Sequence, residues 1–431
     1  MKPRNSSIVL AAIVTLALAA SLLAGSGQRA VRRYRYVGLG TTGGAFSGGN
    51  SINALGWVSG FSTLSGDATQ HAVLWRPGEG ALDLGTLGGD NSGVEWLVHD
   101  RRGRIAGISE TGVADPYGEI WSCGFFFPSF THQVCRGFVW QDGVMTELPT
   151  LGGDNGYAAG SNNLGQIAGW AETSDPDPTC NAPQVLGFQA VVYGPAPGEI
   201  RALPPYPGDP DGAATAVNDR GQVVGISGLC ANAVGGLSAR HALLWEDGVA
   251  TDLGNLGGQA WNTPTAINER GEVVGFSDLP ADDPAHPNYH AFLWTKTGGM
   301  RDIGTLPGDV RTQALGVNDE GQVVGLSIDA AHDIRAFLWE DGEMIDLNDL
   351  VPSGSPFLLY ANDIDDRGEI TGEAYDPVTG TAPAFRLIPE DEPPAVETAA
   401  PAGNAMALRP PAEVPEALRL SIERRLALGG H

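Results

Sequence analysis

The sequence predicts an all-β protein, specifically a seven-bladed β-propeller with four antiparallel strands in each blade. A segment of the type Gly-Gln-Val-Val-Gly recurs seven times, and its leading glycines lie 47 to 62 residues apart, at Gly56, Gly103, Gly165, Gly221, Gly271, Gly321 and Gly368. This period is typical of one four-stranded propeller blade. The 61 glycines and 30 prolines among 431 residues also favour many turns over long helices.

The best-formed repeat unit, residues 314–350, contains four short apolar runs separated by turn signals. Its first two runs meet at residues 318–321 (NDEG), where Asn and Asp form side-chain turns and Gly accepts positive φ. Its last two runs meet at residues 341–342 (DG), a dipeptide preferred in two-residue hairpins. The runs are short and rich in β-branched, Leu and aromatic residues, which favours strands over helices. The unit is therefore predicted to be a four-stranded antiparallel meander.

The last repeat lacks a fourth strand. It stops after its third strand near Ile388, whereas a segment of the fourth-strand type, residues 34–45 (YRYVGLGTTGGA), precedes every first strand. Pairing these two ends would close the ring and remove an open sheet edge. We therefore expect the N-terminal strand to complete the last blade, in a propeller that spans residues 30–388.

The segments outside the repeats have different compositions. Residues 1–27 contain basic residues, then an apolar stretch, then a small polar stretch, which is typical of a signal peptide or of an N-terminal anchor. They predict export to the extracellular space or the periplasm. Residues 389–416 are rich in Pro, Ala and Glu and are predicted to be a disordered linker. Residues 417–431 alternate apolar and basic residues and could form a short amphipathic helix.

The charge of the chain restricts its partners. The formal net charge is −26, and the only lysines are Lys2 and Lys296, so a phosphate-neutralising surface and a nucleic-acid partner are not expected. No later segment is apolar enough for a membrane-spanning helix, so membrane contact is expected only through an N-terminal anchor. The partners still open are an extracellular polymer, a glycan or a protein surface. We expect the protein to be a monomer.

Four cysteines fit an oxidising compartment. Cys123 and Cys135 are 12 residues apart within one long link, and Cys180 and Cys230 lie in the long links of the next two blades. Three connectivities are open to four cysteines. We predict that Cys123 pairs with Cys135 and that Cys180 pairs with Cys230.

The recurring third strand has a recognisable sequence. It reads HAVLW, RGFVW, QAVVY, HALLW, HAFLW and RAFLW in six copies. Together with the DLGTLGG and GQVVG segments, it makes residues 34–388 resemble the bacterial extracellular repeat proteins of the HAF family, named for the His-Ala-Phe of this strand. The full triplet appears once, at residues 290–292, with variants at His71, His241 and Arg335. The resemblance implies an exported repeat protein and brings no catalytic residues with it.

The third strands also carry recurring His and Trp residues. His71, His241 and His290 begin such strands, but equivalent positions in adjacent blades lie on the order of 14 Å apart, too far to share one metal ion. We expect these histidines to make structural hydrogen bonds. The tryptophan that ends the strand is expected to fill the gap between neighbouring sheets, as Trp75, Trp140, Trp245, Trp294 and Trp339.

The turns that follow the fourth strands lead toward the mouth of the central channel. Their carboxylates Asp90, Asp154, Asp209 and Asp309 are candidate ligand contacts. Asp90, Asp154 and Asp309 are weak candidates for binding Ca²⁺, because hard cations prefer oxygen ligands. The simpler interpretation is that each Asp caps its own turn. No other cofactor is expected.

The links between second and third strands are expanded in four consecutive blades, over residues 109–135, 171–188, 227–240 and 277–289. These links share one face of a propeller with the turns described above, and loops on a rigid scaffold commonly carry binding sites. The first link contains an aromatic group in which Tyr117, Trp121, Phe126 and His132 are candidate ligand contacts. The group is either an exposed contact patch or a small core beneath its own loop.

Two functions remain open. The first is a secreted, non-catalytic binding or scaffolding propeller of unknown ligand, with its site on the face of the expanded links. The alternative is a carbohydrate-active or other hydrolytic enzyme that uses Asp90, Asp115 or Asp154 with His132. The sequence contains no nucleophile elbow and no HExxH zinc motif. We therefore assign no catalytic residue and favour the binding function.

Overall fold

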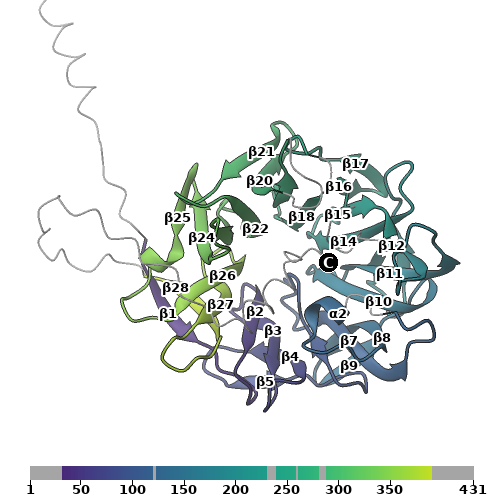
Figure 1. Ribbon diagram of the computed structural model, residues 1–431, viewed down its shortest axis with the longest axis horizontal. Helices are drawn as coiled ribbons and strands as arrows, with labels where there is room; N and C mark the ends of the chain where they lie inside the picture. Colours follow the sequence, from purple (N-terminus) through teal and green to yellow (C-terminus); the bar gives the residue numbers. More distant parts are fainter. Residues whose placement is uncertain (1–31, 120–122, 231–238, 259–260, 281–287, 391–431) are drawn as a thin grey trace, which may run out of the picture.

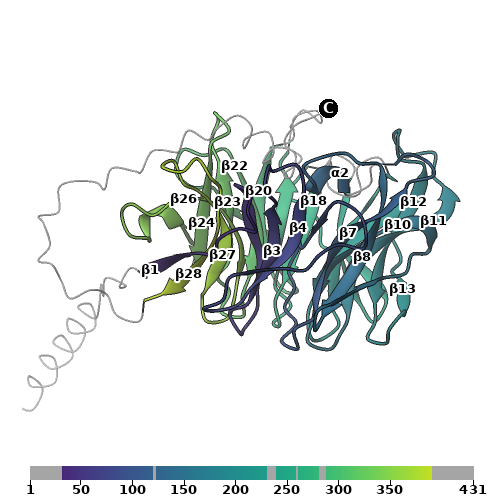
Figure 2. The ribbon, with the colours of Figure 1, turned by 90° about the horizontal axis from the view of Figure 1, so that it is seen from below.

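The computed structural model describes residues 32–119, 123–230, 239–258, 261–280 and 288–390. Within them the chain forms seven four-stranded antiparallel sheets, arranged as the blades of a propeller around a central axis (Figure 1). In side view the strands run across the thickness of a disc (Figure 2). The described helices are the short α2 (Cys123–Phe126) and the 3₁₀-helix η2 (Leu347–Asp349). The predicted fold class is confirmed.

The first four blades each run from the innermost strand outward. Their strands are β2 (Ser47–Ile52), β3 (Val58–Thr63), β4 (Gln70–Trp75) and β5 (Ala81–Asp83); β6 (Ser92–Gly93), β7 (Ile105–Ala114), β8 (Gln133–Gln141) and β9 (Val144–Glu147); β10 (Gly152–Ser161), β11 (Ile167–Pro176), β12 (Leu186–Tyr193) and β13 (Ile200–Ala202); β14 (Asp211–Val217), β15 (Val223–Gly228), β16 (His241–Glu246) and β17 (Val249–Asp252).

The remaining three blades complete the ring. Their strands are β18 (Asn262–Ile267), β19 (Val273–Asp278), β20 (Tyr289–Thr295) and β21 (Gly299–Gly304); β22 (Arg311–Val317), β23 (Val323–Ile328), β24 (Ile334–Glu340) and β25 (Glu343–Asp346); β26 (Phe357–Ile364), β27 (Ile370–Tyr375), β28 (Ala384–Pro389) and the N-terminal β1 (Tyr34–Gly38).

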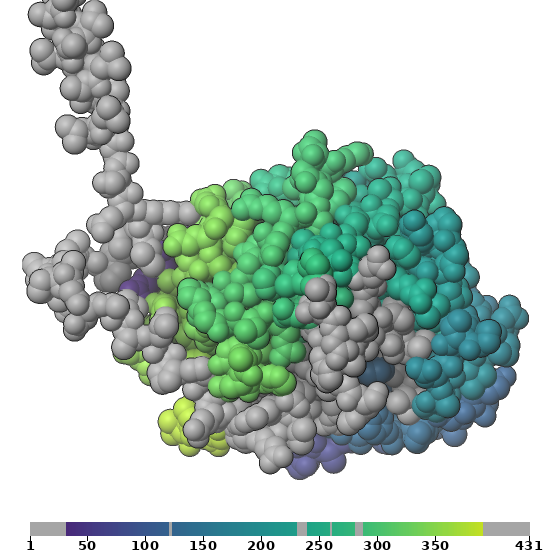
Figure 3. Space-filling view, turned by 45° about the horizontal axis from the view of Figure 1, so that its top comes forward, coloured from purple at the N-terminus to yellow at the C-terminus, as the bar shows by residue number. Residues whose placement is uncertain are grey.

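The closure of the last blade is as predicted. Strand β1 pairs antiparallel with β28, with Tyr34 opposite Pro389 and Gly38 opposite Phe385. The space-filling view shows the purple start of the described chain beside the yellow-green last blade (Figure 3). Tyr34 is fully buried in a core cluster that includes Leu350 and Leu387. The two ends of the propeller therefore share one sheet and one hydrophobic core.

The glycines of the repeat have two separate structural roles. The leading glycine of each copy has positive φ, from 71° at Gly56 to 93° at Gly165, in the turn before the second strand. The second glycine lies against the innermost strand, where a Cβ would clash with a main-chain carbonyl oxygen, as at Gly325 with Gln313. The first position requires left-handed backbone and the second requires close approach of two strands. These two requirements explain why the motif persists in all seven blades.

The recurring third-strand residues are structural, as expected. The five tryptophans are buried, and the Trp245 Nε1 donates a hydrogen bond to the Pro204 carbonyl at 2.7 Å. His71 and His290 lie 2.9 and 2.8 Å from carboxylate oxygens of Asp83 and Asp302 on the neighbouring fourth strands. These side chains hold each blade together and do not converge on a ligand.

A ring of side-chain hydrogen bonds connects neighbouring blades at one mouth of the channel. The Nδ2 of Asn218 donates to the Asn268 carbonyl at 3.0 Å, and Asn268 repeats the contact with Asn318 at 2.9 Å. Asn318 then reaches the Asp365 carbonyl at 3.0 Å. Each asparagine also accepts hydrogen bonds from amides of its own turn, as Asn318 does from Gln322 N at 3.0 Å. The Asn-x-x-Gly turn therefore fixes the blade and its neighbour together.

Candidate functional site

A cavity of about 170 Å³ lies on the propeller axis, at the channel mouth opposite the asparagine ring. Five innermost strands each carry a β-bulge, and the bulged residue of each lines the cavity: Asn50, Thr215, Thr265, Leu315 and Asn362. In four of these strands the residue two positions earlier also lines the cavity, and Glu95 and Leu97 of the segment after β6 complete two rows. The first row is Asn50, Leu97, Thr215, Thr265, Leu315 and Asn362, and the second is Glu95, Ala213, Thr263, Gln313 and Tyr360.

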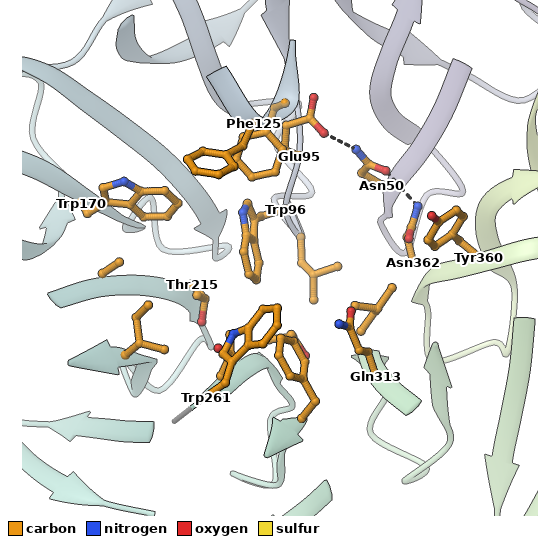
Figure 4. Close-up of a pocket in the computed structure, with 18 of the residues that line it drawn as sticks. Asn50, Glu95, Trp96, Phe125, Trp170, Thr215, Trp261, Gln313, Tyr360 and Asn362 are labelled. Carbon is orange, nitrogen blue, oxygen red and sulfur yellow. Dashed lines mark hydrogen bonds between the residues drawn. The ribbon is translucent and has the colours of Figure 1, made fainter. Parts of the chain in front are cut away.

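Aromatic rings form one side of the cavity. Figure 4 shows Trp96 near the centre, with Phe125, Trp170 and Trp261 around it. Trp261 packs edge-on against Phe276, with ring centroids 5.3 Å apart. Trp170 is held from behind by Tyr157, which stacks on it at a centroid distance of 4.0 Å. These rings come from the second, third and fifth blades and are fixed by packing behind them.

A hydrogen-bonded chain of polar side chains forms the other side. The Nε2 of Gln70 donates to Glu95 Oε1 at 3.1 Å, and Asn50 Nδ2 donates to Glu95 Oε2 at 3.1 Å. Asn362 Nδ2 then donates to Asn50 Oδ1 at 2.9 Å (Figure 4). Because each amide has a fixed partner, the orientation of each group is set before any ligand arrives. The chain crosses the second, first and seventh blades.

Glu373 adds a second carboxylate to the cavity lining. It occupies the sixth position of the recurring second-strand motif, where the other copies carry an apolar residue: Phe61, Ile108, Trp170, Ile226, Phe276 and Leu326. Its side chain is only 4% exposed. Space for the carboxylate depends on Gly48 of the next blade, where a Cβ would lie 2.6 Å from Glu373 Oε1. The absence of a side chain at Gly48 therefore leaves room for the Glu373 carboxylate.

Few of the contacts predicted from the sequence line this cavity. Of its predicted contacts, Phe126 lines the cavity, while Tyr117 is 52% exposed and does not. His132 lies with Nδ1 3.1 Å from the Gly118 carbonyl and is also outside the lining. Trp121 lies outside the described residues. The aromatic group of the first expanded link is thus divided between surface, cavity and core, where Phe127 is buried.

The carboxylates of the turns lie elsewhere. None of Asp90, Asp154, Asp209 and Asp309 is among the described residues that line the cavity. Asp209 Oδ2 lies 2.7 Å from His241 Nδ1, and Asp309 forms an ion pair with Arg335. Asp90 accepts a hydrogen bond from Gln133 Nε2 at 3.1 Å. Three of the four therefore contact side chains on the third strand of the blade that follows their turn.

The structure also describes the surroundings of the candidate Ca²⁺ ligands and of Asp115, one of the candidate hydrolytic residues. Within the described ranges, no group of three or more His, Cys, Asp or Glu residues is arranged to hold a metal ion. Asp115 is buried and accepts hydrogen bonds from the amides of Tyr117 and Glu119, both at 2.9 Å. It therefore caps a turn.

Both predicted disulfides are present. Cys123 pairs with Cys135 across a Cα separation of 6.3 Å, and Cys180 pairs with Cys230 across 4.6 Å. The first anchors α2, which carries Phe125 and Phe126, beside β8. The second joins the expanded links of the third and fourth blades. Two disulfides indicate an oxidising, extracellular or periplasmic environment. Within the described residues, no helix has the length and apolar character needed to span a membrane.

A buried pair of carboxyl groups supports the wall beside the cavity. Glu119 Oε1 accepts hydrogen bonds from the amides of Val185 and Leu186 at 2.7 and 2.8 Å, which ties the link of the second blade to that of the third. Asn155 Nδ2 donates to both Glu119 and Glu172. Burial, together with the adjacent Glu119, raises the pKa of Glu172 to about 8. Glu172 therefore keeps its proton at neutral pH.

Comparisons with known proteins show the fold. No protein-family model matches the chain, and no curated protein matches it. Among solved structures it is similar to the acylaminoacyl peptidase of Pyrococcus horikoshii, at 12% identity and a TM-score of 0.50, over 82% of this chain and 53% of that one. The chain therefore spans about half the length of the peptidase.

Two other solved structures are more distant. An oligogalacturonate lyase from Vibrio parahaemolyticus matches at 10% identity and a TM-score of 0.40, over 84% of this chain and 92% of that one. A sialidase from Trypanosoma rangeli matches at 8% identity and a TM-score of 0.36, over 83% and 55%. At such identities the similarity extends to the propeller fold alone. Fold and site define a β-propeller with a ligand-sized cavity at its channel mouth.

Proposed function

We propose that the chain is an exported, non-catalytic binding propeller whose ligand sits in the channel-mouth cavity. The observation that carries the proposal is the division of the cavity into an aromatic side around Trp96 and a polar side around Asn50. Binding sites for small molecules are typically apolar concavities with a few placed polar groups. The face is the one on which the expanded links lie, because Phe125 and Phe126 of the first link line the cavity.

Export is the second part of the proposal. Residues 1–27 have the composition of a signal peptide, and the two disulfides require an oxidising compartment to form. The repeat motifs also support membership of the HAF family of extracellular repeat proteins. These arguments concern where the protein acts and are independent of the cavity.

The ligand proposed for the cavity is one ring-shaped unit of an extracellular glycan. A cavity of about 150 Å³ holds one six-membered ring, and this one has about 170 Å³. The C–H face of a sugar stacks on indole rings, while its hydroxyl groups need amide and carboxylate partners such as Asn50, Asn362 and Glu95. The cavity offers both on opposite sides.

A panel of soluble oligosaccharides tests the proposal, with binding followed by intrinsic tryptophan fluorescence and by calorimetry. Trp96→Ala should weaken binding at least about tenfold, because it removes the central ring. Phe125→Ala, at a half-exposed position, should weaken it less. Val249→Ala on the outermost strand β17 is the control and should bind as the wild type does. A binding glycan whose affinity is the same in all four proteins would refute the cavity as the site.

A second function is supported by one observation, the presence of two carboxylates, Glu95 and Glu373, in the same cavity. Glycoside hydrolysis uses such a pair, one as acid and one as base or nucleophile. This version differs from the sequence-based alternative, since it uses neither Asp90, Asp115 and Asp154 nor His132. Product analysis separates the functions: a hydrolase would cleave a bound oligosaccharide and lose that turnover in Glu95→Gln, whereas the binding protein would return it intact.

A further inference from the structure

We propose that the sugar unit held in the cavity carries an acetamido group, so that the ligand is an N-acetylated glycan; this inference rests on the binding function proposed above. Three polar atoms at the boundary between the fifth and sixth blades carry the inference. Trp261 Nε1, Thr263 Oγ1 and Gln313 Nε2 belong to residues that line the cavity, and within the described part of the chain they have no hydrogen-bond partner. Each of these residues is at most 4% exposed. Buried polar groups are normally paired, so three such atoms around one cavity point to a partner supplied by the ligand.

The three atoms lie close together. Trp261 immediately precedes β18, which carries Thr263, and Gln313 is on β22. Thr265 Oγ1 of β18 donates a hydrogen bond to the Ala314 carbonyl of β22 at 2.8 Å, so the two strands lie side by side at this level. In Figure 4 the Gln313 amide points into the cavity, on the side where Trp261 lies. We call Trp261 Nε1, Thr263 Oγ1 and Gln313 Nε2 the donor cluster.

The neighbouring polar groups do not satisfy the donor cluster. Tyr289 is fully buried beside Trp261, with ring centroids 5.4 Å apart. Its hydroxyl lies next to the Gln313 amide, but the two groups are not placed to form a hydrogen bond. Thr263 also differs from Thr265, two residues along the same strand, whose hydroxyl donates to main-chain carbonyls. The cluster therefore needs a partner that the neighbouring side chains do not provide.

The chemistry of the donor cluster favours a carbonyl oxygen as its partner. An indole N–H and an amide N–H₂ can only donate. A carbonyl oxygen has two lone pairs and no hydrogen, so it can accept from Trp261 and Gln313 without bringing a donor of its own. A sugar hydroxyl in the same place would bring a hydrogen that needs a further acceptor. The Thr263 hydroxyl both donates and accepts, so it can take the N–H of an acetamido group, which an ester-linked acetyl group lacks.

Apolar side chains beside the donor cluster suit the methyl of an acetamido group. Phe276, the cross-strand neighbour of Thr263, lines the cavity and packs against Trp261 with ring centroids 5.3 Å apart. Ile226 and Ala213 also line the cavity and belong to the same hydrophobic cluster as Phe276 and Trp261. A methyl group placed among them would be removed from water, which contributes to affinity. Hydrogen-bond donors and apolar surface therefore occur side by side, as the two ends of an acetamido group require.

A neutral carbonyl fits this part of the cavity better than a carboxylate or an ammonium group does. The donor cluster consists of neutral groups, and the described lining of the cavity includes no Lys, Arg or His. A carboxylate buried there would lose its hydration without gaining a charged partner from that lining, which costs more than burying an amide. An ammonium group can only donate, so it would leave Trp261 and Gln313 without an acceptor. The N-acetylated sugar is therefore favoured over a uronic acid and over an unacetylated amino sugar.

Calorimetry on the full chain tests the inference with four probes: the β-1,4-linked trisaccharides of N-acetylglucosamine, glucosamine and glucose, which differ only in the group on C2, and a galacturonate trisaccharide. We expect the N-acetylated trisaccharide to bind at least about tenfold tighter than each of the other three. Thr263→Val and Gln313→Met each remove one member of the donor cluster at similar side-chain size and should weaken its binding about five- to tenfold. Thr251→Val, at an exposed position of β17, is the matched control and should bind as the wild type does.

Thermal unfolding without ligand tests the donor cluster separately. Because Thr263→Val removes a buried hydroxyl that has no partner in the described chain, the variant should unfold at or above the wild-type temperature. A variant that unfolds well below the wild type would show that the hydroxyl is already bonded within the protein, and would overturn the inference.

The binding outcomes separate the two proposals. Binding of the glucose, glucosamine or galacturonate trisaccharide as tightly as the N-acetylated one would overturn the acetamido inference and leave the glycan-binding function standing. The same holds if Thr263→Val and Gln313→Met both bind the N-acetylated trisaccharide as the wild type does. Binding of none of the four probes by a folded wild-type protein would overturn the inference. Failure across the whole oligosaccharide panel would overturn the binding function itself.

Discussion

Asn50 Nδ2 lies 3.1 Å from Glu95 Oε2, across the boundary between the first and second blades. The contact joins β2 to the segment that follows β6, between residues that are 45 positions apart in sequence. Asn50 is also the acceptor for Asn362 of the seventh blade. The side chain of Asn50 therefore connects three blades by hydrogen bonds at the cavity wall.

Replacing that residue should affect stability as well as binding. Asn50→Leu has a similar volume but leaves Glu95 and Asn362 each without one partner. Because buried polar groups that lose a partner carry their desolvation cost, the substitution should lower the free energy of unfolding by about 1–3 kcal/mol. Urea denaturation followed by fluorescence measures the change. Leu164→Ala, at an exposed turn position, serves as control, and equal midpoints for both variants would contradict the role of Asn50.

The buried acid pair predicts a pH dependence of stability. Burial raises the pKa of Glu172 to about 8, so the native state retains a proton that the unfolded chain has released. Stability should then fall as pH rises from about 4.5 to about 8, by as much as about 1.4 kcal/mol per pH unit for each proton involved. Asp211, whose pKa burial raises to about 7, contributes in the same direction.

Glu172→Gln isolates the contribution of the pair. Glutamine can still donate to Glu119 but does not titrate, so the variant should show a shallower decline of stability between pH 4.5 and 8. Denaturation midpoints at several pH values give the slope. Glu343→Gln is the matched control, since it removes one exposed carboxylate. A slope in Glu172→Gln as steep as in the wild type would rule out the pair as its source.

The closure of the ring predicts a strong effect at the N-terminal strand. Deleting residues 30–44 exposes the edge of β28 and should produce an aggregating protein with a lower melting temperature. Tyr34→Ala is a milder change that empties a core position and should cost about 3–5 kcal/mol. Arg35→Ala, at the adjacent exposed position, should cost less than about 0.5 kcal/mol. A monomeric deletion variant with an unchanged melting temperature would contradict the closure.

The two disulfides should contribute unequally to stability. The Cys180–Cys230 bridge closes a loop of 50 residues and the Cys123–Cys135 bridge one of 12. The loop-entropy relation gives about 4 kcal/mol for the first and about 3 kcal/mol for the second. Paired Cys→Ser variants, compared by denaturation, test the order. A larger loss from the shorter loop would show that local packing of α2, and not chain entropy, dominates.

The sequence predicted the scaffold well because the scaffold is repeated. Because the motif recurs seven times, substitutions in single copies do not hide the strand pattern. The unpaired fourth-strand segment at Tyr34 indicated how the last blade closes. The disulfides followed because each cysteine lies in a link that interrupts the repeat. These predictions needed only the repeat pattern and the positions of the unpaired strand and the cysteines along the chain.

The site was harder to predict because its described residues come from five innermost strands, from several second strands and from the links between strands. Asn50, Glu95 and Asn362 share no local motif and meet only when the ring closes. Two signals were nevertheless present. Glu373 is the charged exception at an otherwise apolar position of the repeat, and Trp96, Trp170 and Trp261 lie outside the third-strand series. Departures from a repeat, read position by position, would have located the cavity.

A crystal structure of the protein grown with the tightest-binding oligosaccharide of the panel tests the central claim most directly. We expect one sugar ring within the channel-mouth cavity, stacked on Trp96, with a hydroxyl oxygen about 3 Å from a side-chain polar atom of Asn50 or Asn362. A cavity without sugar at a saturating concentration, or a sugar bound between the outer strands of two blades, would contradict it.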